Sequence, residues 1–314
     1  MPSRTATRVR FGTNEPTPWP PELPAGESAP PGALIDYYLP KDATDPITLE
    51  IFDPTGKVVR TYSSTEPVFD PDPGKNMAAY DEVCKKTPTA AYCGLPLYWP
   101  APQFIISSKA GMHRFSWDLK FDPVSQNDLV PAGDEEATGA VPGRTYPNYN
   151  VPWVPPGRYT ARLKVGSVTK TQPITVRLDP RVRIAPEALT TLNTLSTSLY
   201  WEAVAAHRAF NEAKALAGTL ASRSGADAVK SDLEELAPTG LQRNVRALRR
   251  RGGAPATRSL EAVSNALQAA AMAMQSAEIA PTAAQLSAAT SARTEARRIL
   301  ARWAAVKARA AALQ

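Results

Sequence analysis

The sequence changes character near residue 180, and this change limits what the chain can fold into. Of its 31 prolines, only Pro186, Pro238, Pro255 and Pro281 lie beyond that point. Short runs of alternating apolar residues occupy the proline-rich first part, whereas alanine, leucine and arginine follow at helical spacing. Because proline interrupts helices but is tolerated in loops and at strand edges, the pattern predicts a β module followed by a helical module, an α+β chain of two domains.

The β module, residues 32–180, contains six segments with strand character. In one of them Ile47, Leu49 and Ile51 alternate with polar residues and share one face, as in a strand with one buried side. Turn residues separate the segments and no helical pattern lies between them, which predicts an antiparallel β-sandwich. The segments are 33–39, 47–52, 57–62, 111–119, 157–165 and 168–178.

Three proline-rich stretches lie outside these segments. Residues 64–108 and 121–154 are predicted insertions, and their length makes them candidate interaction surfaces because long irregular connections are uncommon in compact domains. Residues 1–31 are predicted to form an extended proline-rich arm. Trp19 lies in this arm, where it either anchors a partner or packs on the chain's own β module.

The helical module, residues 181–314, carries apolar residues at three- and four-residue steps. Three such stripes with reversals between them predict an antiparallel three-helix bundle. Pro186 suits the first turn of a helix, and Thr282 and Gln285 have the spacing of a capping box. The stripes run over 189–220, 260–274 and 286–313.

The charge of the chain is unevenly divided between the two modules. Residues 1–180 carry 18 Lys/Arg and 20 Asp/Glu, whereas residues 181–314 carry 18 and 10. Arg243, Arg246 and Arg250 belong to the densest basic cluster and share one helical face. Arginine binds carboxylates and phosphates in a bidentate way, so this cluster is either a docking patch for an acidic protein or lipid surface, or a solvated tip. Nucleic acid is not expected, because no base-reading or aromatic groups accompany the cluster.

Few residues are available for chemistry. Cys84 and Cys93 form either a disulfide in an oxidising compartment or two free thiols in the cytosol, and a metal site would need further ligands. Neither His113 nor His207 has partners at the spacing of a catalytic triad, so both are predicted to be structural. Nearby acids, including Asp118 and the run 134–136, are interpreted as solvated loop residues. We therefore expect no catalytic site, metal or cofactor.

The insertions also contain aromatic residues that could meet a partner. Trp99 and Trp153 are candidate partner-binding residues, together with Trp19 and the arginine cluster. Aromatic faces can stack on sugars, so the tyrosines near these tryptophans also suggest a carbohydrate-related function. These tyrosines are Tyr98, Tyr146 and Tyr149.

The order of four segments resembles the C-terminal region of bacterial BNR/YVTN-repeat β-propeller proteins of sortilin-like or glycosyl-hydrolase-like type. The resemblance implies an Ig-like domain followed by a helical bundle, and export to an oxidising compartment such as the periplasm, which favours the disulfide. The propeller itself is missing, so no hydrolase activity transfers. The chain is therefore expected to be either a fragment or a separate subunit. The segments are 30–39, 47–60, 111–119 and 156–163.

These observations favour binding over catalysis. The leading prediction is a non-enzymatic structural or adaptor subunit whose partners are other protein subunits of a larger complex, a membrane-associated complex being one candidate. The alternative is a carbohydrate-related accessory module detached from a propeller-type glycoside hydrolase. No run of about 18 apolar residues indicates a transmembrane segment, and the N-terminus lacks the apolar stretch of a signal peptide.

Overall fold

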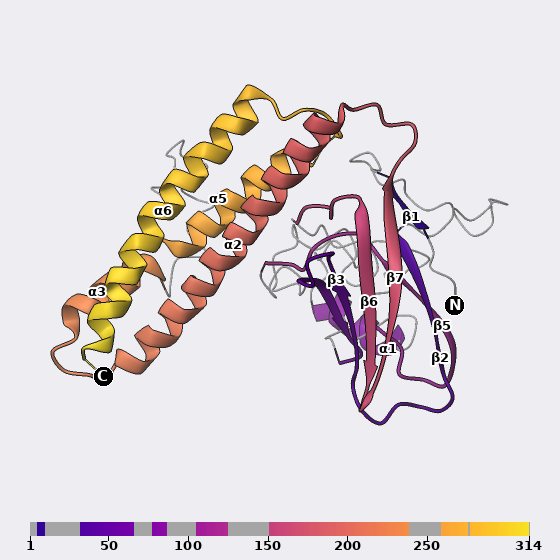
Figure 1. Ribbon diagram of the computed structural model, residues 1–314. Helices are drawn as coiled ribbons and strands as arrows, with labels where there is room; N and C mark the ends of the chain where they lie inside the picture. Colours follow the sequence, from indigo (N-terminus) through magenta and orange to yellow (C-terminus); the bar gives the residue numbers. More distant parts are fainter. Residues whose placement is uncertain are drawn as a thin grey trace. The chain divides into compact units, whose positions relative to one another are not determined.

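The computed structural model describes residues 5–9, 32–65, 77–86, 105–124, 151–238, 259–275 and 277–313. The chain divides into two compact units, Met1–Arg183 and Ile184–Gln314, a boundary three residues beyond the expected one. The first unit contains the β-sheets and the second the long helices, so the fold is mixed α+β (Figure 1).

The first unit contains a five-stranded sheet. Its centre is antiparallel: β6 pairs with β7 on one side and with β3 on the other, and β3 also pairs with β4. The hairpin between β6 and β7 turns at Gly166, whose positive φ of 54° suits glycine. In sheet order the strands are β1 (Thr5–Arg8), β7 (Val168–Leu178), β6 (Gly157–Val165), β3 (Ile47–Phe52) and β4 (Val58–Ser63).

A second sheet consists of β2 (Ala33–Leu39) and β5 (Gly111–Trp117), paired antiparallel. Gly32 directly precedes β2 with a φ of 92°, and a Cβ at this position would lie 2.1 Å from the carbonyl oxygen of Trp117. Both the backbone conformation and the close approach therefore require glycine there. The six strand segments expected from the sequence are thus all present.

Aromatic side chains from the two sheets meet in the core of this unit. Tyr62 on β4 contacts Phe115 on β5 edge-to-face, with ring centroids 4.6 Å apart. Trp117 on β5 contacts Tyr159 on β6 in the same manner at 5.3 Å. All four rings are buried, and edge-to-face pairs of this kind add stability beyond the burial of their area.

The structure corrects the predicted arm and the all-antiparallel sheet. Residues 5–8, expected within the extended arm, form β1, which pairs parallel with the distant end of β7. Arg8 is buried, and its Nη1 donates a hydrogen bond of 2.6 Å to the carbonyl oxygen of Val154. A four-residue strand whose partner lies some 170 residues away leaves almost no local signal in the sequence.

The two predicted insertions also need correction. Helix α1 (Met77–Lys86) lies within the segment expected to be irregular and proline-interrupted. The described ends of the insertions belong to the core rather than to surface loops. Their buried residues are Ile106, Phe121, Val151 and Val154.

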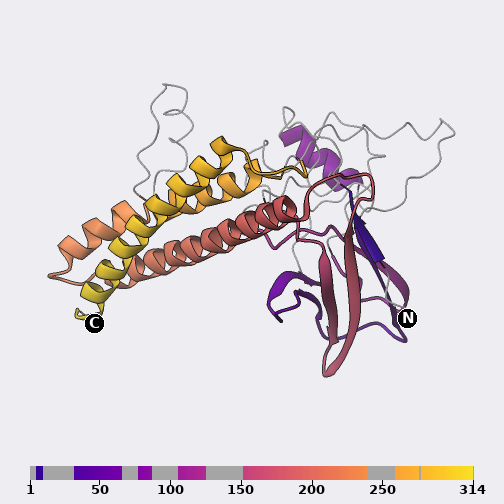
Figure 2. The same cartoon turned by 45° about the horizontal axis from the view of Figure 1, so that its top comes forward.

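Among the described residues, the second unit contains the long helices α2 (Pro186–Leu220) and α6 (Ala283–Ala311) together with the shorter α3 (Asp227–Leu236) and α5 (Leu260–Ala273). The three apolar stripes expected from the sequence lie on α2, α5 and α6, and α3 adds a further helix. All four contribute to one buried cluster that includes Leu199, Leu233, Leu267 and Ile299. Figures 1 and 2 show α2, α5 and α6 lying alongside one another.

Small side chains and caps define how these helices pack and begin. Ala203 and Ala206 on α2 are fully buried, and the carbonyl oxygen of Ala203 accepts a 2.9 Å hydrogen bond from the Ser264 hydroxyl on α5. The predicted capping box is confirmed, because the side chains of Thr282 and Gln285 each bond to the other's backbone N–H.

Candidate interaction surface

Most of the residues selected from the sequence lie outside the described part of the chain. These are Trp19, Trp99, Arg243, Arg246, Arg250 and Cys93, as well as the aromatic residues Tyr98, Tyr146 and Tyr149. Two others are described. Cys84 lies on α1 and is disulfide-bonded, and Trp153 precedes β6.

Trp153 packs on the chain itself. Its backbone forms an isolated bridge with Lys120, and the Lys120 ammonium lies 5.7 Å from the centroid of its ring. Its neighbours Val151 and Val154 are fully buried, and Trp153 is half-buried. Trp153 is therefore partly covered by its own chain, and its role in binding a partner stays a prediction.

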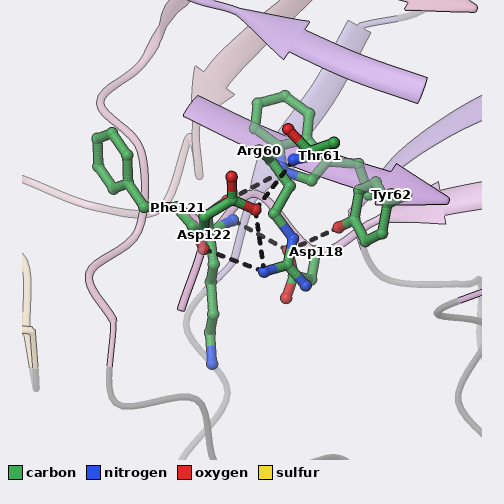
Figure 3. Close-up of polar contacts among 8 residues, drawn as sticks. Arg60, Thr61, Tyr62, Asp118, Phe121 and Asp122 are labelled. Carbon is green, nitrogen blue, oxygen red and sulfur yellow. Dashed lines mark hydrogen bonds and ion pairs between the residues drawn. The ribbon is translucent and has the colours of Figure 1, made fainter. Parts of the chain in front are cut away.

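A cluster of polar residues joins the end of β5 to β4 (Figure 3). Arg60 is only 3% exposed, and its Nη1 lies 3.6 Å from Asp122 Oδ1 and 3.4 Å from the Phe121 carbonyl oxygen. The Asp122 carboxylate also accepts a 2.9 Å bond from the Thr61 backbone N–H. These contacts fix the segment after β5 against the edge strand.

Asp118 completes this cluster from the other end of the same segment. It accepts a 3.4 Å bond from the Tyr62 hydroxyl and a 3.1 Å bond from the backbone N–H of Lys120. The sequence predicts that Asp118 is a solvated loop acid, but the carboxylates of Asp118 and Asp122 hold buried groups in place. Between them Leu119 adopts a φ of 61°, a left-handed conformation that costs a residue with a Cβ free energy.

The electrostatics of the cluster are dominated by burial. Burial raises the pKa of Asp122 above its ordinary value of 3.8, and the Asp118 carboxylate adds to this rise, whereas Arg60 and the Thr61 N–H oppose it. The guanidinium of Arg60 also lies over the Tyr62 ring at 4.6 Å from its centroid. Arg60 and Tyr62 are sealed from solvent, so this arrangement is suited to holding the fold together.

The two histidines occupy structural settings. His113 stacks on Tyr37 with ring centroids 5.0 Å apart, and its Nε2 lies 2.7 Å from the Lys109 carbonyl oxygen. His207 lies against Phe210 on α2. Within the described residues, no group of three or more His, Cys, Asp and Glu side chains is placed to hold a metal ion.

The outer face of the two-stranded sheet exposes a pair of large apolar side chains. Tyr38 on β2 and Met112 on β5 lie directly opposite one another in the register, and each is 63% exposed. The next outward-facing pair is ionic: Arg114 Nε donates a 2.7 Å bond to Asp36 Oδ1. We call the Tyr38–Met112 pair the apolar pair. Alternation along β2 is enough to predict that Tyr38 points outward. Its pairing with Met112 depends on the register between β2 and β5, which the sequence does not reveal.

The basic residues described on α6 are mostly neutralised within the helical unit. Arg293 pairs with Glu202 on α2, and Arg302 pairs with Asp232 and Glu235 on α3. Arg309 also reaches Asp232. These contacts cross between helices, so much of the described positive charge on α6 contributes to packing.

No family model, curated protein or solved structure matches this chain. None of the described helices is long and apolar enough to cross a membrane.

Proposed function

We propose that this chain is a non-enzymatic structural or adaptor subunit that docks onto a larger protein complex and stabilises it. The apolar pair carries this proposal. Single exposed apolar side chains are normal on soluble proteins, whereas contiguous exposed apolar surface is one mark of a site where another protein docks. Tyr38 and Met112 are of this kind, because each is 63% exposed and the two are cross-strand neighbours. Tyrosine and methionine are also enriched in protein–protein interfaces.

The strand order supports an Ig-like sandwich as the framework for such a role. Strands β7, β6, β3 and β4 lie in the order of strands G, F, C and C′ of an Ig domain, and β2 and β5 correspond to B and E. The Tyr159 hydroxyl near the start of β6 donates a 2.7 Å bond to the carbonyl oxygen of Pro155, four residues upstream. This contact has the form of a tyrosine corner, a recurrent feature of Ig-like domains. The helical unit then follows as an antiparallel bundle.

The disulfide at Cys84 favours an oxidising compartment, because disulfides persist outside the cytosol. We therefore place the complex in the periplasm or at the cell surface. The resemblance to the C-terminal region of propeller proteins leads to the same location. The carbohydrate-binding alternative gains no support, since Trp153, the one aromatic candidate in the described residues, is half-buried against its own chain.

The experiment that tests this proposal compares matched variants of the full-length tagged chain in its native source. The double variant Tyr38→Ser with Met112→Ser removes the apolar pair. Val168→Ser is the control, because Val168 is also an exposed apolar residue of the same unit, 57% exposed at the tip of the β6–β7 hairpin. Co-purifying proteins are identified by mass spectrometry and their stoichiometry is measured.

The proposal predicts that the wild type and the control recover the same partner at a fixed ratio, whereas the double variant loses it and retains its circular dichroism spectrum. A wild-type chain recovered alone would refute the adaptor role. If the double variant also recovered the partner, the apolar pair would not be the surface that contacts the partner.

A further inference from the structure

The outer face of the five-stranded sheet is basic and rich in threonine. The described charged residues that point outward from its strands are four basic side chains and one acidic one, Glu50, and Asp53 follows directly after β3. The four basic residues are Arg158, Arg162, Lys164 and Arg177, and we call their surface the basic face. Threonines fill most of the remaining outward positions, namely Thr5, Thr7, Thr48, Thr61, Thr160, Thr169, Thr171 and Thr175.

Strand alternation places these side chains together. Tyr159 and Ala161 point into the core, so Arg158, Arg162 and Lys164 on β6 point outward on the same side. Arg158 lies opposite Thr175 in the register, which makes Arg177 its diagonal neighbour on β7. Successive outward residues on a strand are about 7 Å apart, so the positive groups form a row along the sheet.

Most of this charge is uncompensated within the described residues. Arg162 is the exception: its guanidinium bonds to Glu50 Oε2 at 2.7 Å and 3.0 Å and covers the ring of Phe52 at 4.3 Å. No carboxylate among the described residues pairs with Arg158, Lys164 or Arg177, although each is exposed. This differs from α6, where most of the described basic side chains have carboxylate partners.

A shallow open hollow lies on the same face between the two arginines of β6. Arg158, Thr160 and Arg162 line it from β6, and Thr171 and Pro173 line it from β7. Asp53 also borders the hollow, but its Oδ1 is occupied by hydrogen bonds from the backbone N–H groups of Thr55 and Lys57 and from the Thr55 hydroxyl. The rim therefore presents the Arg158 guanidinium and neighbouring threonine hydroxyls to an acidic side chain, beside the Arg162 guanidinium that is already bonded to Glu50.

We propose that the basic face is the docking surface for an extended acidic segment of a partner protein, with carboxylates at alternate positions. This inference rests on the adaptor role and adds the surface and the chemistry of its partner. Carboxylate side chains on one side of an extended segment repeat about every 7 Å, the same spacing as the outward residues of β6. Arginine forks bind carboxylates in a bidentate way, and threonine hydroxyls can hydrogen-bond to the same oxygens.

The composition of the face favours protein over the other anionic partners. Stable attachment to a lipid surface uses apolar side chains that enter the bilayer, and Phe52, the aromatic residue of this face, lies beneath the Arg162 guanidinium. Binding to single-stranded nucleic acid relies on open aromatic rings on which bases stack. The Phe52 ring is not open in this way, because the Arg162 guanidinium covers it. A flat row of cations and hydroxyls suits a carboxylate-rich chain.

The test uses the full-length chain and a synthetic peptide with glutamate at alternate positions, with a glutamine version of the peptide as its control. The basic-face variant combines Arg158→Gln, Lys164→Gln and Arg177→Gln. A matched variant removes the same charge from the helical unit at exposed arginines, by Arg208→Gln, Arg223→Gln and Arg297→Gln. Binding is measured by fluorescence anisotropy at low and high salt.

The proposal predicts that the glutamate peptide binds the wild type and the matched variant equally and in a salt-dependent manner. The basic-face variant should bind about tenfold more weakly, because three surface ion pairs together account for about one decade in affinity. A variant in which the same three residues are replaced by glutamate should instead bind a peptide with lysine at alternate positions. Binding of the lysine peptide would show that this variant is folded, so that its loss of glutamate-peptide binding is not a loss of fold. Equal binding by all variants would overturn the proposal.

Three further outcomes distinguish the nature of the partner and separate this surface from the adaptor role. Binding to phosphatidylserine vesicles without binding to the glutamate peptide would assign the face to lipid and overturn the proposal. If the native complex forms with the basic-face variant as it does with the wild type, the face is not the contact, although the adaptor role stands. If the wild-type chain itself forms no complex, the adaptor role fails as well.

Discussion

The contribution of Arg60 to the β unit can be tested by replacing it with methionine, which retains the apolar stem but removes the charge. Removing one partner of a fully buried ion pair costs roughly 3–5 kcal/mol. The Asp122 side chain is 37% exposed, so water hydrates part of the released charge. The cation–π contact with Tyr62 is lost as well. Together these changes should lower the free energy of unfolding of the unit by about 2 kcal/mol at neutral pH.

The pH dependence of this loss follows from the carboxyl of Asp122. A carboxyl whose pKa is raised in the folded state destabilises the fold when it ionises, so stability falls as pH rises through that pKa. Without Arg60 the pKa should rise further, because the nearest cation that opposes burial is gone. The difference between Arg60→Met and the wild type should therefore be largest near neutral pH. It should shrink as pH falls toward the ordinary carboxyl pKa of 3.8.

The assay is urea unfolding of the full chain followed by near-ultraviolet circular dichroism, to which the buried aromatic cluster around Trp117 contributes. Far-ultraviolet circular dichroism follows the helical unit separately, because a chain of two units need not unfold in one step. Unfolding is compared at about pH 7 and near the ordinary carboxyl pKa of 3.8, where the Asp122 carboxyl is protonated to a greater extent. A loss of the same size at both pH values, or no loss at all, would refute the electrostatic role assigned to Arg60.

Three further substitutions test other parts of the fold by the midpoint of urea unfolding. Tyr159→Phe removes the bond to the carbonyl oxygen of Pro155 and should cost about 1 kcal/mol; an unchanged midpoint would contradict the corner assignment. Gly32→Ala should cost about 2 kcal/mol or more, because it adds strain at a positive φ and a clash with Trp117, so wild-type stability would be inconsistent with this backbone. Leu233→Ala should destabilise the helical unit by roughly 2–5 kcal/mol, and a small effect would show that α3 is not part of its core.

The strands and long helices could be predicted because their signals are local. Alternation within 47–52 and 157–165 and the apolar stripe of α2 require only neighbouring residues. The sequence did not reveal β1, because four residues with two threonines become a strand only by pairing with the distant end of β7. Helix α1 was also missed, because prolines on both sides of it suggested irregular structure throughout.

The interaction surfaces were harder to predict for a related reason. Alternation within β6 already places Arg158, Arg162 and Lys164 on one side, so this signal is present in the sequence, but the arginines in 243–251 form a denser basic cluster along the chain. The apolar pair depends on the register between β2 and β5, which are separated by more than 70 residues. The polar cluster around Arg60 depends likewise on a fold that brings β4 next to the end of β5.

The central claim is that the chain acts as a subunit of a larger assembly. The most direct test is to isolate the native protein gently from both the membrane and the soluble fractions of its source, determine its molar mass by light scattering and identify co-purifying chains by mass spectrometry. The proposal predicts one defined complex in which this chain is present at a fixed stoichiometry with at least one other protein. Recovery of the chain as a monomer of 33.7 kDa in both fractions would contradict it.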